Sequence, residues 1–314
     1  MLHLIRRRYL YFAISALIII PGIVAMVVSF ARYGTPVRLS IDFTSGSYVE
    51  VEFAQPVQAG QVRQVFLDEG LEVASVQLSG GDHIAIVRSQ VMDAATKGRV
   101  VAALGKSIGP VTERRFDSVG PSISRVVTRN AFYAVGAAAL VILAFITFAF
   151  RKVPHPFRYG LCAIIAMVHD ILVTVGLFSL AGLLLGWEAD TLFLSALLTV
   201  IGFSVQDTIV VYDRIRENTP KMRGLPFEEI VDHSLTQTLH RSLTTQLNAM
   251  FVMVALLLFG GATIKQFILV MFVGLASGTY SSIFNAVPLL VVWENRDIPR
   301  FFRRLGGRTE GGAA

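Results

Sequence analysis

The chain has 314 residues, of which 54% are hydrophobic and only 16% are charged, a composition that water-soluble globular proteins of this size rarely have. The formal net charge of +6 could suggest a nucleic-acid partner, but the basic residues flank apolar runs and therefore indicate membrane topology. Cys162 is the single cysteine, which excludes an intrachain disulfide and a cysteine metal cluster.

Six apolar runs are each long enough to cross about 30 Å of hydrocarbon, and we expect a transmembrane helix at each. They are Tyr9–Phe30, Ala131–Phe150, Tyr159–Leu185, Thr191–Tyr212, Leu239–Phe259 and Phe267–Trp293. Three arginines precede the first run, as in a signal peptide, but the run is too long for a signal peptide's apolar core. No small-residue cleavage site follows Phe30, so we expect an uncleaved span.

Basic residues set the predicted orientation. Arginines and lysines precede the first run and follow the second, fourth and sixth, whereas the connection between the third and fourth carries Glu188 and Asp190. Under the positive-inside rule, both termini are cytoplasmic. We therefore expect a cytoplasmic N-terminus and first span over 1–30, an extracytoplasmic domain over 31–128, spans two to six over 129–293, and a basic cytoplasmic tail over 294–314.

The hundred or so residues between the first two spans are enough for a small domain. Alternating apolar residues predict four strands, at Ser47–Phe53, Glu72–Leu78, His83–Arg88 and Val111–Val119. Amphipathic segments predict two helices, at Gln58–Glu69 and Val91–Ile108. The order βαββαβ is that of the ferredoxin-like motif. The segment has no His, Asp and Glu cluster with metal-ligand spacing and no phosphate-binding loop, so we expect neither a metal site nor an active site there.

Asp207 lies inside the fourth apolar run, together with Ser204 and Thr208 on the same helical face. A carboxylate in a membrane span costs about 2.5–3.5 kcal/mol on insertion scales. Chains keep such a group mostly where it moves ions, pairs with a partner or binds a ligand. Asp207 is therefore the first candidate functional residue.

A second polar stripe leads into the fifth span, with members three or four positions apart: Gln237, Arg241, Thr244, Thr245 and Asn248. Such a stripe is unfavourable against lipid, so we expect it to face the bundle interior or a water-filled cavity. Asp207 and Arg241 lie at similar depths, which makes a facing pair geometrically possible. The alternative is that Arg241 reaches toward the membrane surface.

The third and sixth spans also carry polar residues. In the third, His169 and Asp170 could either form structural hydrogen bonds to a neighbouring helix or take part in a proton relay. The sixth span has small and polar residues along one face: Gly274, Gly278, Ser281, Ser282 and Asn285. The spacing of the two glycines lets another helix approach closely, and both packing alone and a role in lining a transport path are open.

Several long motifs resemble those of the SecF family, the partner of SecD in the bacterial Sec translocon. They are Ile41-Asp42-Phe43-Thr44 with Gly46, Val119-Gly120-Pro121, His169-Asp170, the run from Asp207 to Asn218, the run from Ser234 to Arg241 and the run from Gly278 to Ile283. Ser40 and Ser45 stand where the family usually has glycines, and Gln206 stands where asparagine is common.

This resemblance implies a six-helix bundle that is half of a resistance–nodulation–division-type transporter, with one inserted α+β ferredoxin-like domain. The resemblance implies neither a covalent catalytic site nor a cofactor. It implies instead that the chain works with SecD in the bacterial inner membrane and uses the proton-motive force to promote late preprotein translocation and release. Implied partners are SecD, the SecY–SecE–SecG channel, YajC, YidC, an unfolded preprotein and the lipid bilayer, without nucleic acid. The family's proton-translocating aspartate and arginine match Asp207 and Arg241, while a second essential carboxylate belongs to SecD.

Two other functions are open to this sequence. A proton-independent scaffold would use the same polar stripes to bind SecD and the SecY channel. An intramembrane aspartyl protease would need Asp170 and Asp207 to meet in one cavity, but their sequence contexts are not those of such enzymes. Both a proton and a sodium ion are compatible with the sequence as the coupling ion. The chain could be made separately or as part of a SecD–SecF fusion.

Overall fold

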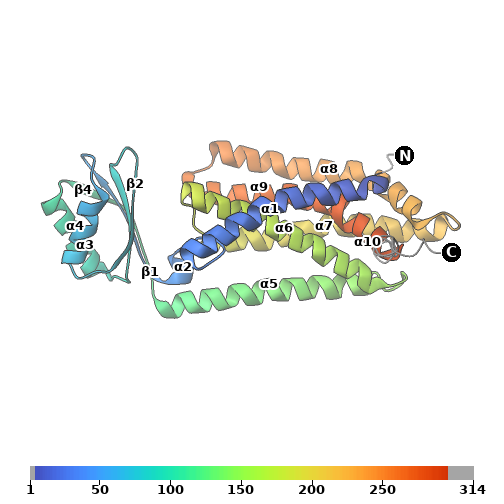
Figure 1. Cartoon of the computed structure of the whole chain (residues 1–314), viewed down its shortest axis with the longest axis horizontal. Helices are drawn as coiled ribbons and strands as arrows, with labels where there is room; N and C mark the ends of the chain where they lie inside the picture. The colour runs from blue at the N-terminus through green and yellow to red at the C-terminus, as the bar shows by residue number, and fades with distance from the viewer. Residues whose placement is uncertain (1–3, 296–314) are drawn as a thin grey trace, which may run out of the picture. The chain divides into compact units, whose positions relative to one another are not determined.

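The structure is a computed structural model that describes residues 4–295, so the predicted basic tail lies outside the described residues from residue 296 onward. The chain divides into two compact units. One, the membrane unit, comprises Met1–Arg38, Tyr133–Trp187 and Leu192–Ala314. The other, the α+β unit, comprises Leu39–Phe132 and Glu188–Thr191. Figure 1 shows the elements of both units.

Six helices within the described residues are long and apolar enough to cross a membrane, one for each predicted run. The first five are α1 (Arg8–Tyr33), α5 (Pro121–Ala149), α6 (Pro156–Leu185), α7 (Thr191–Lys221) and α8 (Phe227–Phe259). The sixth is composed of α9 (Ala262–Ser281), η2 (Ser282–Ala286) and α10 (Val287–Glu294). A short 3-10 helix, η1 (Ile5–Arg7), precedes α1. The predicted six-helix organisation is confirmed. α7 and α8 extend past their apolar runs, because an apolar run marks the hydrocarbon crossing and a helix can continue into water.

The sixth span contains a π-helical turn, η2, between α9 and α10. Pro288 follows directly within the first turn of α10 and has no N–H to donate to the helix. A widened turn is one way for a helix to accommodate a missing donor, and such turns occur often at functional sites. η2 therefore marks a place where the helix departs from regular geometry.

The α+β unit contains one antiparallel sheet in the order β2-β3-β1-β4. Its strands are β1 (Gly46–Phe53), β2 (Val73–Ser79), β3 (Ile84–Ser89) and β4 (Val111–Val119). Helices α3 (Ala59–Asp68) and α4 (Ala94–Ser107) lie on one face of this sheet (Figure 1). The strand order and connections are those of the predicted ferredoxin-like motif.

An apolar core holds the sheet to its helices. Val49 and Val51 of β1 and Val87 of β3 are fully buried, as are Phe66 of α3 and Leu104 of α4. Burial alternates along the two central strands, β1 and β3, as the period of two in their sequences predicts. At the start of α4, Asp93 accepts a hydrogen bond from the Thr96 backbone N–H at 2.8 Å, and this bond holds the pKa of the Asp93 carboxyl below its ordinary value.

A short helix that the sequence patterns did not predict, α2 (Ile41–Thr44), precedes β1. The chain then turns through Ser45, with a φ of 61°, and Gly46, with a φ of 126°. A Cβ at position 46 would lie 2.8 Å from the Ser89 carbonyl oxygen, so only glycine fits there. Ser45 adopts its positive φ despite its side chain, which shows that the turn forms without a second glycine.

Asp42 of α2 connects this turn to the start of α7. Its Oδ2 accepts hydrogen bonds from the backbone N–H of Thr191 at 2.9 Å and from Thr191 Oγ1 at 3.1 Å. Arg88 pairs with Glu188, and the Ser40 N–H donates to the carbonyl oxygen of Ala189 at 2.9 Å. The connection between α6 and α7 is therefore held by the α+β unit.

Candidate functional site

Asp170 of α6 is fully buried and receives hydrogen bonds from two other membrane helices. Ser204 Oγ of α7 donates to Oδ2 at 2.5 Å, Ser281 Oγ of α9 to Oδ2 at 2.7 Å, and Ser277 Oγ of α9 to Oδ1 at 2.6 Å. Nδ1 of His169 lies 3.0 Å from Oδ1. These contacts fill the acceptor sites of a carboxylate, so the Asp170 cluster (Asp170, Ser204, Ser277, Ser281) joins α6, α7 and α9.

Glycines allow the serines to reach Asp170. A Cβ on Gly278 would lie 3.2 Å from the Ser204 Cα, and one on Gly274 would overlap the Val200 side chain. α9 therefore approaches α7 more closely at these two positions than a larger residue would permit. A similar contact joins α1 to α6, where a Cβ on Gly176 would lie 2.7 Å from the Gly22 Cα.

Asp207 follows Ser204 by one turn of α7 and is 4% exposed. Its Oδ2 accepts a hydrogen bond from Nε2 of Gln246 on α8 at 2.7 Å. Arg241 is exposed on α8, and no ion pair within residues 4–295 joins it to Asp207. This chain on its own therefore does not form the Asp207–Arg241 pair that the sequence allows, and Gln246 is the partner of Asp207 on the neighbouring helix.

The face of α8 that is buried in this chain differs from the predicted one. Residues at intervals of four are buried: Ser234, Thr238, Ser242 and Gln246. The predicted stripe is exposed: Gln237, Arg241, Thr244, Thr245 and Asn248. Gln237 contacts Asn218 and His233. The predicted stripe therefore does not face the interior of the chain's own bundle, which leaves the other expectation, a water-filled cavity. Both stripes are polar, and helical spacing alone does not say which one is covered.

Hydrogen bonds link α7 to α1 through η2. Thr208 Oγ1 donates to Ser282 Oγ at 2.8 Å, and Ser282 Oγ donates to the Ser204 carbonyl oxygen at 2.9 Å. Farther along η2, Oδ1 of Asn285 accepts a hydrogen bond from Ser15 Oγ of α1 at 2.9 Å. The residue after Asp207 is thus connected, through the π turn, to the first membrane helix.

Asp170 and Asp207 have separate partners. Hydroxyl groups surround Asp170, whereas an amide contacts Asp207, and no hydrogen bond joins the two carboxyl groups in the described part of the chain. An aspartyl protease needs two carboxyl groups that share a proton, so this arrangement gives that function no support. Residues 4–295 also contain no group of three or more His, Cys, Asp and Glu side chains that could hold a metal ion.

Sequence patterns identified Asp207, Asp170, His169 and Ser204 but missed Ser277 and Gln246. Ser277 lies one turn before Ser281 and could have been found as a member of the same face of α9. Gln246 could have been found from the interval of four that it shares with Ser234, Thr238 and Ser242.

Comparisons with known proteins agree on one family. Residues 100–296 match the family described as protein export membrane protein SecD/SecF, C-terminal, and residues 33–57 match the SecD/SecF GG motif. The protein translocase subunit SecF of Anaerolinea thermophila is 47% identical over 97% of this chain and 98% of its own length. SecF of Thermobaculum terrenum is 46% identical over 97% of this chain and 98% of its own length. SecF of Synechocystis is 35% identical over 91% of this chain and 92% of its own length.

Solved structures of SecDF have the same fold. SecDF from Thermus thermophilus, described as a translocon-associated membrane protein, matches with a TM-score of 0.76 and 31% identity over 92% of this chain and 38% of that chain. SecDF in a super-membrane-facing form matches with a TM-score of 0.62 and 29% identity, over 94% of this chain and 39% of that chain. The chain thus spans less than half of SecDF but nearly all of the SecF relatives. It belongs to the SecD/SecF family of protein-export membrane proteins, as a multi-pass SecF subunit.

Proposed function

We propose that this SecF chain works with SecD as a proton-driven accessory unit of the Sec channel, promoting late translocation and release of preproteins. In this proposal both termini are cytoplasmic and residues 31–128 are extracytoplasmic, which the basic residues at the ends of the spans support. The observation that carries the proposal is the environment of Asp207, a buried carboxyl group in a membrane helix whose side-chain partner among residues 4–295 is one neutral amide.

The contrast with Asp170 supports a role of Asp207 in proton exchange. Three serine hydroxyls donate hydrogen bonds to the Asp170 carboxylate. A proton added to this carboxylate would take the place of one of these hydrogen bonds. The Gln246 amide can donate its N–H to an ionised Asp207 or, after rotation, accept the O–H of a protonated one. An arginine at that place could only donate. Gln246 can therefore accompany Asp207 through both protonation states.

The exposed stripe of α8 supports a partner on that side of the bundle. Arg241, Thr244, Thr245 and Asn248 are exposed along a membrane helix, where contact with lipid is unfavourable for polar groups. We expect SecD to cover this stripe and to contribute the second carboxylate. Arg241 would then act at the interface between the two chains, where it can stabilise a negative charge in the proton path.

Two routes would couple protonation to the α+β unit, one through α1 and one through the start of α7. The Thr208–Ser282 and Asn285–Ser15 hydrogen bonds connect α7 to α1, which leads into that unit. Asp42 holds the first residue of α7. A proton that crosses 100 mV supplies about 2.3 kcal/mol, enough to change a two-state helix equilibrium roughly 40-fold.

Asp207→Asn is the central test. The chain would be reconstituted with SecD and the Sec channel in vesicles, and proton flux and preprotein export would be measured with and without a proton gradient. Asp207→Asn should co-purify with SecD yet abolish proton flux and proton-dependent stimulation. Gln246→Leu should lower both, because it removes the amide partner.

Asp213→Asn is the matched control, because Asp213 lies on the same helix but is about half exposed and pairs with Arg216 on the surface. It should behave as wild type. Normal stimulation by Asp207→Asn would contradict the proposal. Export that is retained when Asp207 and Arg241 are both neutralised would instead support a proton-independent scaffold.

A further inference from the structure

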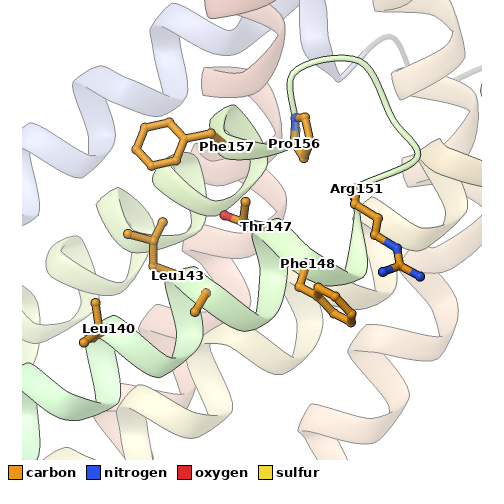
Figure 2. A pocket seen from close by; sticks show the side chains of 8 residues that line it. Leu140, Leu143, Thr147, Phe148, Arg151, Pro156 and Phe157 are labelled. Carbon is orange, nitrogen blue, oxygen red and sulfur yellow. The ribbon is translucent and has the colours of Figure 1, made fainter.

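A hollow of about 500 Å³ lies between α5 and α6, beside the loop that joins them (Figure 2). One face of α5 forms most of its wall, through Leu140, Leu143, Ala144, Thr147 and Phe148. Arg151, in the turn that follows the end of α5 at Ala149, completes this side. Phe157 and Pro156 of α6 form the opposite side. None of the proposed proton-coupling residues lines it.

The hollow has a closed floor because α5 and α6 touch at Gly160. A Cβ at this position would lie 2.9 Å from both Leu143 Cδ1 and Thr147 Oγ1. On the open side, the side chains of Leu140 and Phe148 are largely exposed. In a membrane, this open side faces hydrocarbon, so the natural occupant is apolar over most of its length.

The stripe along α5 has the length and polarity of one lipid leaflet. From Leu140 to Phe148 the helix rises about 12 Å, a little less than half of the roughly 30 Å hydrocarbon core, and Arg151 lies in the turn beyond it. The wall is apolar except for the Thr147 hydroxyl, and beyond it the guanidinium of Arg151 lies over the Phe148 ring at 4.5 Å from its centre (Figure 2). Arg151 is exposed, and no carboxylate in the described residues pairs with it.

We propose that this hollow binds one acyl chain of an anionic phospholipid and that Arg151 binds the phosphate of its headgroup. Basic residues beside a cleft between membrane helices are a common setting for anionic headgroups. Charge favours a phospholipid over a protein helix as the occupant, because the Arg151 cation at the end of an apolar wall matches an anionic headgroup above an acyl chain. The inference uses the membrane spans and not the proton chemistry, and only the choice of the cytoplasmic leaflet depends on the proposed orientation.

The test compares lipid retention by variants of the full chain, purified with its SecD counterpart and embedded in nanodiscs. Discs would contain phosphatidylcholine with increasing phosphatidylglycerol, and native mass spectrometry would count the phospholipids that stay bound. Wild type should retain phosphatidylglycerol several-fold over phosphatidylcholine. Arg151→Gln should abolish this preference, since the apolar wall is unchanged but the cation is gone.

Lys152→Gln is the matched control, because Lys152 is the next residue, carries the same charge and is exposed, but does not line the hollow. It should keep the preference. Ala144→Phe and, separately, Leu140→Trp should reduce retention of both lipids by filling the hollow while Arg151 stays in place. Both lie on an exposed part of α5, and co-purification with SecD would verify folding.

Three outcomes would overturn the proposal. Equal losses in Arg151→Gln and Lys152→Gln would mean that lipid follows only the general surface charge of the loop. Unchanged retention in both filling variants would mean that no acyl chain enters the hollow. A photoreactive residue at position 148 that captures a SecD peptide in place of phospholipid would identify the hollow as a helix-binding site.

Discussion

The α+β unit and the membrane unit bury different kinds of side chain. Val49, Phe66 and Leu104 are fully buried in the first, whereas serines, threonines and three aspartates (Asp170, Asp207 and Asp232) are buried beside the apolar core in the second. In water, burial of apolar surface drives a sheet and its helices together. Lipid is as apolar as leucine, so membrane helices associate through close packing and hydrogen bonds instead. Polar residues therefore say more about where the membrane helices meet than apolar residues do.

Phe66→Ala should have the largest effect on stability. Phe66 is fully buried in the core of the α+β unit, and removing such a ring costs about 3–5 kcal/mol. Pulse proteolysis of the full chain in urea, following cleavage within residues 39–132, would measure the loss. Leu67→Ala is the control, because the neighbouring Leu67 is 45% exposed and should change the free energy of unfolding much less. Equal effects would show that the apolar core does not hold this unit.

Asp170→Ala tests the corresponding statement for the membrane unit. It leaves three serine hydroxyls without their acceptor, and hydrogen bonds between membrane helices average about 0.6 kcal/mol and reach about 1.7. We therefore expect a loss of roughly 2–4 kcal/mol, measured by reversible unfolding in bicelles. Asp213→Ala removes only a surface pair with Arg216 and should cost under about 1 kcal/mol. If Asp170→Ala is equally mild, polar contacts do not define where these helices meet.

Asp42→Ala tests the segment in which the chain passes from one unit to the other, and its effect should be the smallest. Asp42 accepts hydrogen bonds from Thr191 at the start of α7, and loss of a helix cap costs about 0.5–2 kcal/mol. Hydrogen exchange of the amides in the first turn of α7 should accelerate about 2- to 30-fold. Asp68→Ala, which removes an exposed contact with Gln64, should leave that turn unchanged. No acceleration in Asp42→Ala would mean that the carboxylate does not hold the helix start.

Most of the fold could be predicted because its periodicity is local. The six apolar runs and the alternating strands each follow from the residues within one element, and the ends differ from the structure mainly where helices continue past the membrane. η2 could not be predicted, because its neighbour Pro288 signals a missing donor but not how the helix responds. α2 is only four residues long, too short for a helical period to show.

The candidate site was only partly predictable because its contacts join different helices. The cost of a charge in a membrane identified Asp207 and Asp170 as unusual, but three serines on two helices surround the latter. Arg241 has a longer and more strongly charged side chain than Gln246, so it was the more obvious partner for Asp207. Which one reaches the carboxylate depends on the rotation of α8 about its axis, and two polar stripes on one helix leave that rotation undetermined.

The segment Glu188–Thr191 has a mechanical consequence. The α+β unit is joined to the membrane unit at Arg38–Leu39 and Phe132–Tyr133, and again where the connection between α6 and α7 enters and leaves it. The helix that carries Asp207 therefore has its first residue in the α+β unit and the rest of its length in the membrane unit. Because Asp42 holds Thr191, a displacement of this residue is passed directly to the first turn of α7.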